Sequence, residues 1–242
     1  MKSKKLQKLG IHFVNKGFPE VVDFLSEQIQ RERKTFLVTA NPEIVMYARE
    51  NSEYRDLVQT ADLVVPDGFG IILASKILKS PIQERVTGYD LTIRLLELAN
   101  QNQWRIYLLG GQDRTNKKAI DHIRNQFPNV MIAGSHHGFF DWNKNTISEE
   151  IRASEPDIVF VALGFPKQEK WIAENISKFS KGLFIGVGGS IDVLAGEVKR
   201  APEIWQKMNL EWFYRLLMQP SRWRRMLALP QFLIEIFKIK LK

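Results

Sequence analysis

The chain of 242 residues contains no cysteine, and several other common features are also missing. Without cysteine there is no disulfide scaffold, no thiol nucleophile and no thiolate metal site. No apolar run reaches the roughly 18 residues needed to span a bilayer, and the basic N-terminus lacks the apolar segment of a signal peptide. We therefore expect a cytoplasmic protein, either soluble or peripheral to a membrane.

Metal and nucleotide signatures are absent as well. The sequence has no Asp-x-Asp motif, by which many nucleotide-sugar enzymes hold a metal and a diphosphate, and no P-loop, HExxH or GxSxG. We expect neither a metal site nor a cofactor. If a nucleotide diphosphate is bound, arginines and helix N-termini must compensate its charge.

Positive charge is abundant and concentrated at the C-terminal end. The formal net charge is +8, and from Trp205 onward eight Lys and Arg residues accompany only two Glu residues. A localised basic segment attracts anionic lipid, nucleic acid or a phosphate-bearing substrate. Because Leu229–Leu241 would carry a strongly apolar helix face, a solvated nucleic-acid-binding arm fits poorly. We expect no nucleic acid partner.

Short apolar runs alternate with segments of helical periodicity over the first 200 residues. This alternation predicts an α/β domain, a Rossmann-like and largely parallel sheet with helices on both faces. The expected strands are Thr35–Thr39, Leu63–Val65, Arg105–Leu109, Val130–Ala133, Ile158–Leu163 and Leu183–Val187. The expected helices are Pro19–Arg31, Ile44–Val58, Gly88–Asn100, Asn116–Phe127 and Gln168–Phe179.

Residues 201–242 form a second unit, a helical and basic appendage. Trp205, Met208, Trp212 and Leu216 follow helical spacing, and a further helix follows Pro230. Its apolar face contains Leu229, Phe232, Leu233, Ile236, Phe237 and Leu241. An amphipathic helix with lysines fits a membrane interface, where each basic residue contributes about 1 kcal/mol. The alternative is that the face packs on the body or between subunits of a homo-oligomer.

Ligands of parallel sheets bind beyond the C-terminal ends of the strands, so the residues that follow each strand are the candidates. Asn41 can cap a helix opened by Pro42 or present that helix to an anion. Asp67, between Pro66 and Gly68, is either a turn residue or a catalytic carboxylate.

Three further segments before expected helices carry candidates of the same kind. Arg85 can bind a diphosphate through bidentate hydrogen bonds or form a surface ion pair. The Gly110–Gly111 pair allows close approach of a nucleotide or serves packing. Gln168, at a helix start, can contact a ribose or a sugar or be an ordinary first-turn residue.

Seven motifs in order resemble the WecG/TagA/CpsF family of bacterial glycosyltransferases over nearly the whole chain. They are Thr39–Glu43, Pro66–Gly68, Glu84–Asp90, Leu109–Gly111, Gly164–Glu169, Arg200–Pro202 and Leu210–Arg215. The resemblance implies an inverting, metal-independent transferase on the inner face of the plasma membrane. Its donor would be a UDP-sugar, most simply UDP-N-acetylmannosamine, and its acceptor an undecaprenyl-diphosphate-linked N-acetylglucosamine, as in wall teichoic acid synthesis.

The resemblance also assigns roles to residues. It implies Asp67 as general base, and Thr39, Asn41, Arg85 and Gln168 as residues of the donor or acceptor pocket. Arg215, Arg222 and Arg225 would meet the diphosphate from the appendage, and Gly110, Gly111 and Asp192 would lie near the nucleotide. Two alternatives stay open: another hexose donor such as the uronic acid of N-acetylmannosamine, or a nucleotide-dependent oxidoreductase that uses the glycine turns.

Overall fold

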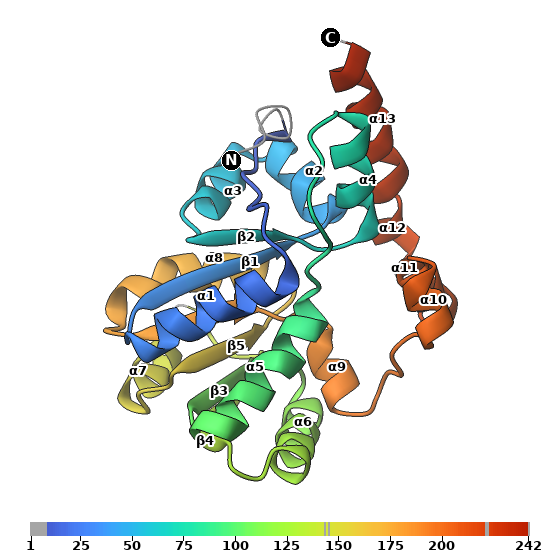
Figure 1. Cartoon of the computed structure of the whole chain (residues 1–242). Coiled ribbons are helices and arrows are strands. Elements are labelled where there is room, and N and C mark those ends of the chain that lie inside the picture. The colour runs from blue at the N-terminus through green and yellow to red at the C-terminus, as the bar shows by residue number, and fades with distance from the viewer. Residues whose placement is uncertain (1–8, 143, 145, 221–222, 242) are drawn as a thin grey trace.

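A computed structural model describes residues 9–142, 144, 146–220 and 223–241. Its centre is a six-stranded parallel sheet in the order β2-β1-β6-β5-β3-β4 (Figure 1). The strands are β1 (Lys34–Ala40), β2 (Leu63–Pro66), β3 (Arg105–Gly110), β4 (Met131–His136), β5 (Ile158–Ala162) and β6 (Gly182–Gly186). All six expected strands are present, and the predicted α/β class is confirmed.

Helices cover both faces of the sheet and enclose two separate apolar cores. Alternation along β1 supplies both cores, because Phe36 and Val38 point to one face and Leu37 to the other. The Leu37 face is covered by α1 (Phe18–Gln30), α5 (Gly88–Asn102), α6 (Asp113–Gln126) and α9 (Ser190–Leu194). The Phe36 face is covered by α2 (Pro42–Glu50), α3 (Ser52–Gln59), α4 (Phe69–Ile77), α7 (Thr146–Ala153), α8 (Lys167–Asn175) with the 3-10 turn η2 (Ile176–Lys178), and α13 (Ala228–Leu241).

Two expected helices are each divided in the structure. Asn51 leaves the helical conformation after α2, and its side chain accepts the Tyr54 N–H at 2.9 Å to cap α3. In the appendage, α10 (Glu203–Lys207) and α11 (Glu211–Met218) are separated by Asn209, which has a positive φ of 61°. Helix α4 was not anticipated, because nearly all its residues are apolar and show no amphipathic period.

The last helix, α13, packs on the body beside α2 and α4 (Figure 1). Phe232 and Ile236 are fully buried in the core there, and Arg49 of α2 pairs with Glu235 at 2.8 Å. Part of the predicted apolar face is therefore packed on the body, as the alternative predicts, and contact of the exposed remainder with a membrane stays a prediction. Burying two such side chains contributes about 1.5–3 kcal/mol each, which favours packing on the body.

The remaining appendage helices, α10, α11 and α12 (Trp223–Met226), lie beyond the sheet (Figure 1). Arg200 secures the chain that leads to them: its guanidinium pairs with Asp90 at 2.6 Å and lies 4.5 Å from the Tyr89 ring centroid. Among the described residues, no helix combines the length and apolar character needed to cross a membrane.

Candidate active site

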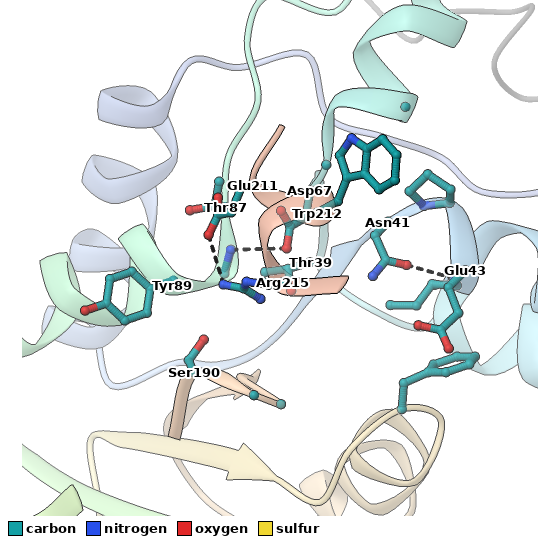
Figure 2. A pocket seen from close by; sticks show the side chains of 18 of the residues that line it. Thr39, Asn41, Glu43, Asp67, Thr87, Tyr89, Ser190, Glu211, Trp212 and Arg215 are labelled. Carbon is teal, nitrogen blue, oxygen red and sulfur yellow. Dashed lines mark hydrogen bonds and ion pairs between the residues drawn. The ribbon is translucent and has the colours of Figure 1, made fainter. Parts of the chain in front are cut away.

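A cavity of about 290 Å³ opens at the C-terminal edge of the sheet. It lies over the adjacent strands β2, β1, β6 and β5, and the appendage closes one side of it (Figure 2). The residues that follow these strands supply its floor, as expected for a parallel sheet. Six of the predicted site residues line it: Thr39, Asn41, Asp67, Arg85, Gln168 and Arg215.

Asp67 stands directly after β2. Its backbone N–H donates to the Ala40 carbonyl at 2.9 Å, which ties this turn to the end of β1. Gly68 follows with a φ of 90°, a conformation that a residue with a side chain adopts only with strain, and the chain turns into α4. The carboxylate consequently points into the cavity, where its Oδ2 accepts the Gly88 N–H at 3.4 Å (Figure 2).

The electrostatic surroundings of Asp67 suit a proton acceptor. Burial raises the pKa of its carboxyl above the usual range, whereas the Arg85 and Arg215 guanidinium groups and the Gly88 N–H oppose that rise. The negative charge of Glu211 adds to it. A carboxylate with a raised pKa is a stronger base than an exposed one, as long as it is ionised at the working pH.

Two arginines from distant parts of the chain meet beside Asp67. Arg85 comes from the loop before α5, and Arg215 from α11 of the appendage. Glu211, one turn before Arg215, contacts both: it lies 3.0 Å from the Arg215 Nη2 and 3.6 Å from the Arg85 Nη2. Two cations therefore flank the candidate base, and one of them exists at the site only because the appendage is docked.

Helix N-termini provide further positive potential. Asn41 caps α2 by accepting the Ile44 N–H at 3.0 Å, so its predicted capping role is confirmed, and its amide nitrogen faces the cavity (Figure 2). Thr87 caps α5 by accepting the Asp90 N–H at 3.0 Å. Gly88 begins that helix against Thr39, where a Cβ would lie 3.1 Å from the Thr39 hydroxyl. The starts of α2 and α5 thus both open on the cavity, where their N–H groups suit an anion.

Gln168 is held from both ends of its amide. Its Nε2 donates to Glu169 Oε1 at 2.7 Å, and its Oε1 accepts the Gly188 N–H at 3.1 Å. A side chain at Gly186 would collide with it at 2.5 Å, so the glycine turn after β6 is shaped around this amide. Burial raises the pKa of Glu169 to about 7. Its Oε2 is buried, and the nearby buried Tyr54 hydroxyl opposes that rise.

Three described residues of the predicted site, Gly110, Gly111 and Asp192, do not line this cavity. Gly110 ends β3 and Gly111 follows it, and the strand order places β3 beyond β5. Packing explains them: a Cβ on Gly110 would lie 2.3 Å from the Ala162 carbonyl oxygen, and one on Gly111 would meet Ile191 at 2.9 Å. Asp192, in α9, is also outside the lining, so the nucleotide role of these three residues stays a prediction.

Arg222 and the side chain of Arg225 lie outside the described residues, so their predicted contacts with a diphosphate stay predictions. Several lining residues were not anticipated, including Glu211, Trp212 and Leu229 of the appendage and Ser190 at the start of α9. The Leu210–Arg215 motif contained a signal for Glu211, because Glu211 and Arg215 are one helical turn apart. Within the part of the chain that is described, no three His, Asp or Glu residues are grouped to hold a metal ion.

Comparison with known proteins gives consistent matches along the chain. The family described as "Glycosyl transferase WecG/TagA/CpsF family" matches residues 6–242. A Bacillus spizizenii protein is 38% identical over 98% of this chain and 92% of its own length, and a Bacillus subtilis protein is 37% identical over 95% and 90%. A Staphylococcus aureus protein is 38% identical over 98% and 94%. All three are named N-acetylglucosaminyldiphosphoundecaprenol N-acetyl-beta-D-mannosaminyltransferase.

Proposed function

The chain belongs to the WecG/TagA/CpsF family of glycosyltransferases, and from that membership we propose that it transfers N-acetylmannosamine from a UDP-sugar to undecaprenyl-diphosphate-linked N-acetylglucosamine. The names of its relatives support this acceptor and this sugar. The family resemblance adds the proposal that the product serves wall teichoic acid synthesis. The observation that carries the proposal is the placement of Asp67 between Arg85 and Arg215 in one cavity built by body and appendage.

The proposed reaction is a single in-line displacement with inversion. Asp67 takes the proton of the acceptor hydroxyl while the oxygen of that hydroxyl attacks the anomeric carbon of the donor sugar. The transition state has oxocarbenium character. The bond to UDP breaks on the opposite face, and the electron pair leaves with the diphosphate. Arg85, Arg215 and the N–H groups at the starts of α2 and α5, which line the cavity, would stabilise this developing charge. Arg222 and Arg225 would add to them from the appendage.

Turnover of a short-chain lipid-diphosphate N-acetylglucosamine with a panel of UDP-sugars tests the proposal. UDP-N-acetylmannosamine, its uronic acid and UDP-N-acetylglucosamine should be offered separately, with and without added chelator. We expect transfer from UDP-N-acetylmannosamine and no effect of the chelator. Transfer only from the uronic acid donor would reject N-acetylmannosamine as the transferred sugar but would still support the proposed glycosyl transfer. No transfer from any donor would reject the proposed reaction.

We further propose that the appendage docks on the inner face of the membrane that holds the lipid acceptor. Among the described residues, its exposed apolar side chains are Ile204, Met208, Phe213, Leu217, Met218, Trp223, Leu227, Ile234, Phe237 and Leu241. Lys238 and Lys240 lie on the same last helix and would favour anionic lipid. The buried Phe232 and Ile236 take no part in this contact.

Vesicle flotation tests whether the exposed apolar side chains of the appendage contact the membrane. Trp223→Glu combined with Phe237→Glu should reduce flotation with anionic vesicles, because both side chains are exposed and would enter the interface. The matched control is Phe139→Glu, an exposed aromatic outside the appendage. Equal flotation of the appendage variant, the control and the unmodified protein would contradict docking by this surface.

A further inference from the structure

Glu211 is an acidic residue buried in a basic appendage. It begins α11, and only 6% of its surface is exposed, although acidic side chains at helix starts are usually solvated. Its carboxylate reaches Arg215 of the same helix at 3.0 Å and Arg85 of the body at 3.6 Å. Glu211 therefore joins the two arginines of the cavity across the junction between body and appendage.

The carboxylate of Glu211 reduces the repulsion between the two arginines. Arg85 and Arg215 are mostly withdrawn from water, with side chains 20% and 29% exposed, and they carry like charges in a shared cavity. Two such cations repel each other, and a charge that is buried without a partner is costly. Asp67 and Glu211 place negative charge beside these two positive charges, so each guanidinium has an acidic neighbour within the cavity.

We propose that Glu211 is a positioning residue, whose carboxylate holds Arg85 of the body and Arg215 of the appendage together at the spacing that a nucleoside diphosphate needs. This inference rests on the proposed function, since it assigns these arginines to the diphosphate of the donor. Glu211 does not touch the reacting atoms. It acts by keeping one guanidinium on each side of the junction aimed into the same cavity.

The opposite role for Glu211 would be that of a competing anion, which the diphosphate must displace. The two roles differ in what happens to Asp67. The groups that act on Asp67 are Arg85, Arg215, the Gly88 N–H and Glu211, and the arginines lower its pKa more than Glu211 raises it. If removal of the Glu211 charge releases the arginines, the pKa of Asp67 rises. If the arginines stay in place, it falls.

UDP binding by the full-length protein, with Glu211→Gln, Glu211→Asp and the control Glu203→Gln, tests the proposal. Glu203 lies on the exposed part of α10 and pairs with Lys207 at the surface. We expect Glu211→Gln to weaken UDP binding about 10-fold, because a charge-assisted contact with two arginines is lost. Glu211→Asp should restore part of the affinity, and Glu203→Gln should leave it unchanged.

A double-mutant cycle separates positioning from a general loss of folding. In an Arg85→Ala variant, Glu211→Gln should reduce UDP affinity by a smaller factor than in the unmodified protein, because one of the two arginines that Glu211 holds is absent. The acidic limb of the kcat/KM profile should also move to higher pH in Glu211→Gln. Additive effects in the cycle, tighter UDP binding or a limb moved to lower pH would overturn the proposal. Absence of UDP binding by the unmodified protein would reject the donor class and this inference with it.

Discussion

The buried carboxyl of Glu169 should make the stability of the fold depend on pH. Glu169 is 2% exposed on α8, and burial raises its pKa from 4.5 to about 7. A carboxyl group with a higher pKa in the folded than in the unfolded state binds its proton more tightly when folded. Its contribution to stability is therefore fully present below about pH 4.5 and is lost as the pH rises through about 7.

The magnitude follows from the same two values. A rise from 4.5 to about 7 corresponds to roughly 3 kcal/mol of differential interaction between the protonated and ionised forms. Between pH 5 and pH 8 the free energy of unfolding should lose about 2 to 3 kcal/mol from this group alone. In the unmodified protein the Gln168 Nε2 donates to Glu169 Oε1 at 2.7 Å. Glu169→Gln removes the ionisable group and keeps a side-chain oxygen that can accept this hydrogen bond.

Urea denaturation at pH 5 and pH 8 measures the effect. From pH 5 to pH 8, the unfolding free energy of the unmodified protein should fall by about 2 to 3 kcal/mol relative to that of Glu169→Gln. Glu174→Gln, on the same helix with a half-exposed side chain, is the matched control and should show no such shift. A difference that does not change with pH would refute the reasoning.

Three further predictions concern the base, the appendage and the sheet. Asp67→Asn should reduce turnover by about 10²–10⁴-fold and leave UDP binding within a few-fold, in a paired turnover and binding assay, because only proton transfer is lost; near-normal turnover would contradict the assignment. Phe232→Ala should destabilise the protein by about 3–5 kcal/mol in chemical denaturation, whereas Phe237→Ala, whose side chain is exposed, should change stability by less than about 0.5 kcal/mol; equal effects would mean that α13 is not docked as described. Gly110→Ala should lower the unfolding free energy by about 1–3 kcal/mol, because its Cβ would lie 2.3 Å from the Ala162 carbonyl oxygen; unchanged thermal unfolding would contradict this packing role.

Local signals accounted for much of the sheet and for part of the cavity. Strand positions followed from short apolar runs, since a strand buried on both faces is apolar throughout. Helix boundaries were less well predicted: the break at Asn51 depends on a cap that periodicity does not reveal, and α4 is too uniformly apolar to show a face. Asn41 and Asp67 were candidates because the ends of parallel strands meet at one edge, whereas Thr39 came from the family resemblance.

The order of the strands in the sheet determined which glycine turn lies at the cavity. The Gly110–Gly111 turn contains a glycine pair, as does the Gly188–Gly189 turn after β6. However, β3 lies outside β5, and Gly110 and Gly111 serve close packing. A chain segment read alone carries no information on strand order, because that order is set by crossovers between distant segments. The same limit applies to Glu169, whose neighbours on either side gave no indication of its burial.

Residue type and spacing were sufficient for the α/β class, the six strands and the helical, basic character of the C-terminal segment, because these properties depend on local periodicity and charge. The tertiary structure decided what each apolar or charged face meets. Phe232 and Ile236 are buried on the body while Phe237 is exposed, and Glu211 joins Arg85 to Arg215 across more than one hundred residues of chain. Helical spacing identifies which residues share a face, but only the packing of distant segments determines what covers it.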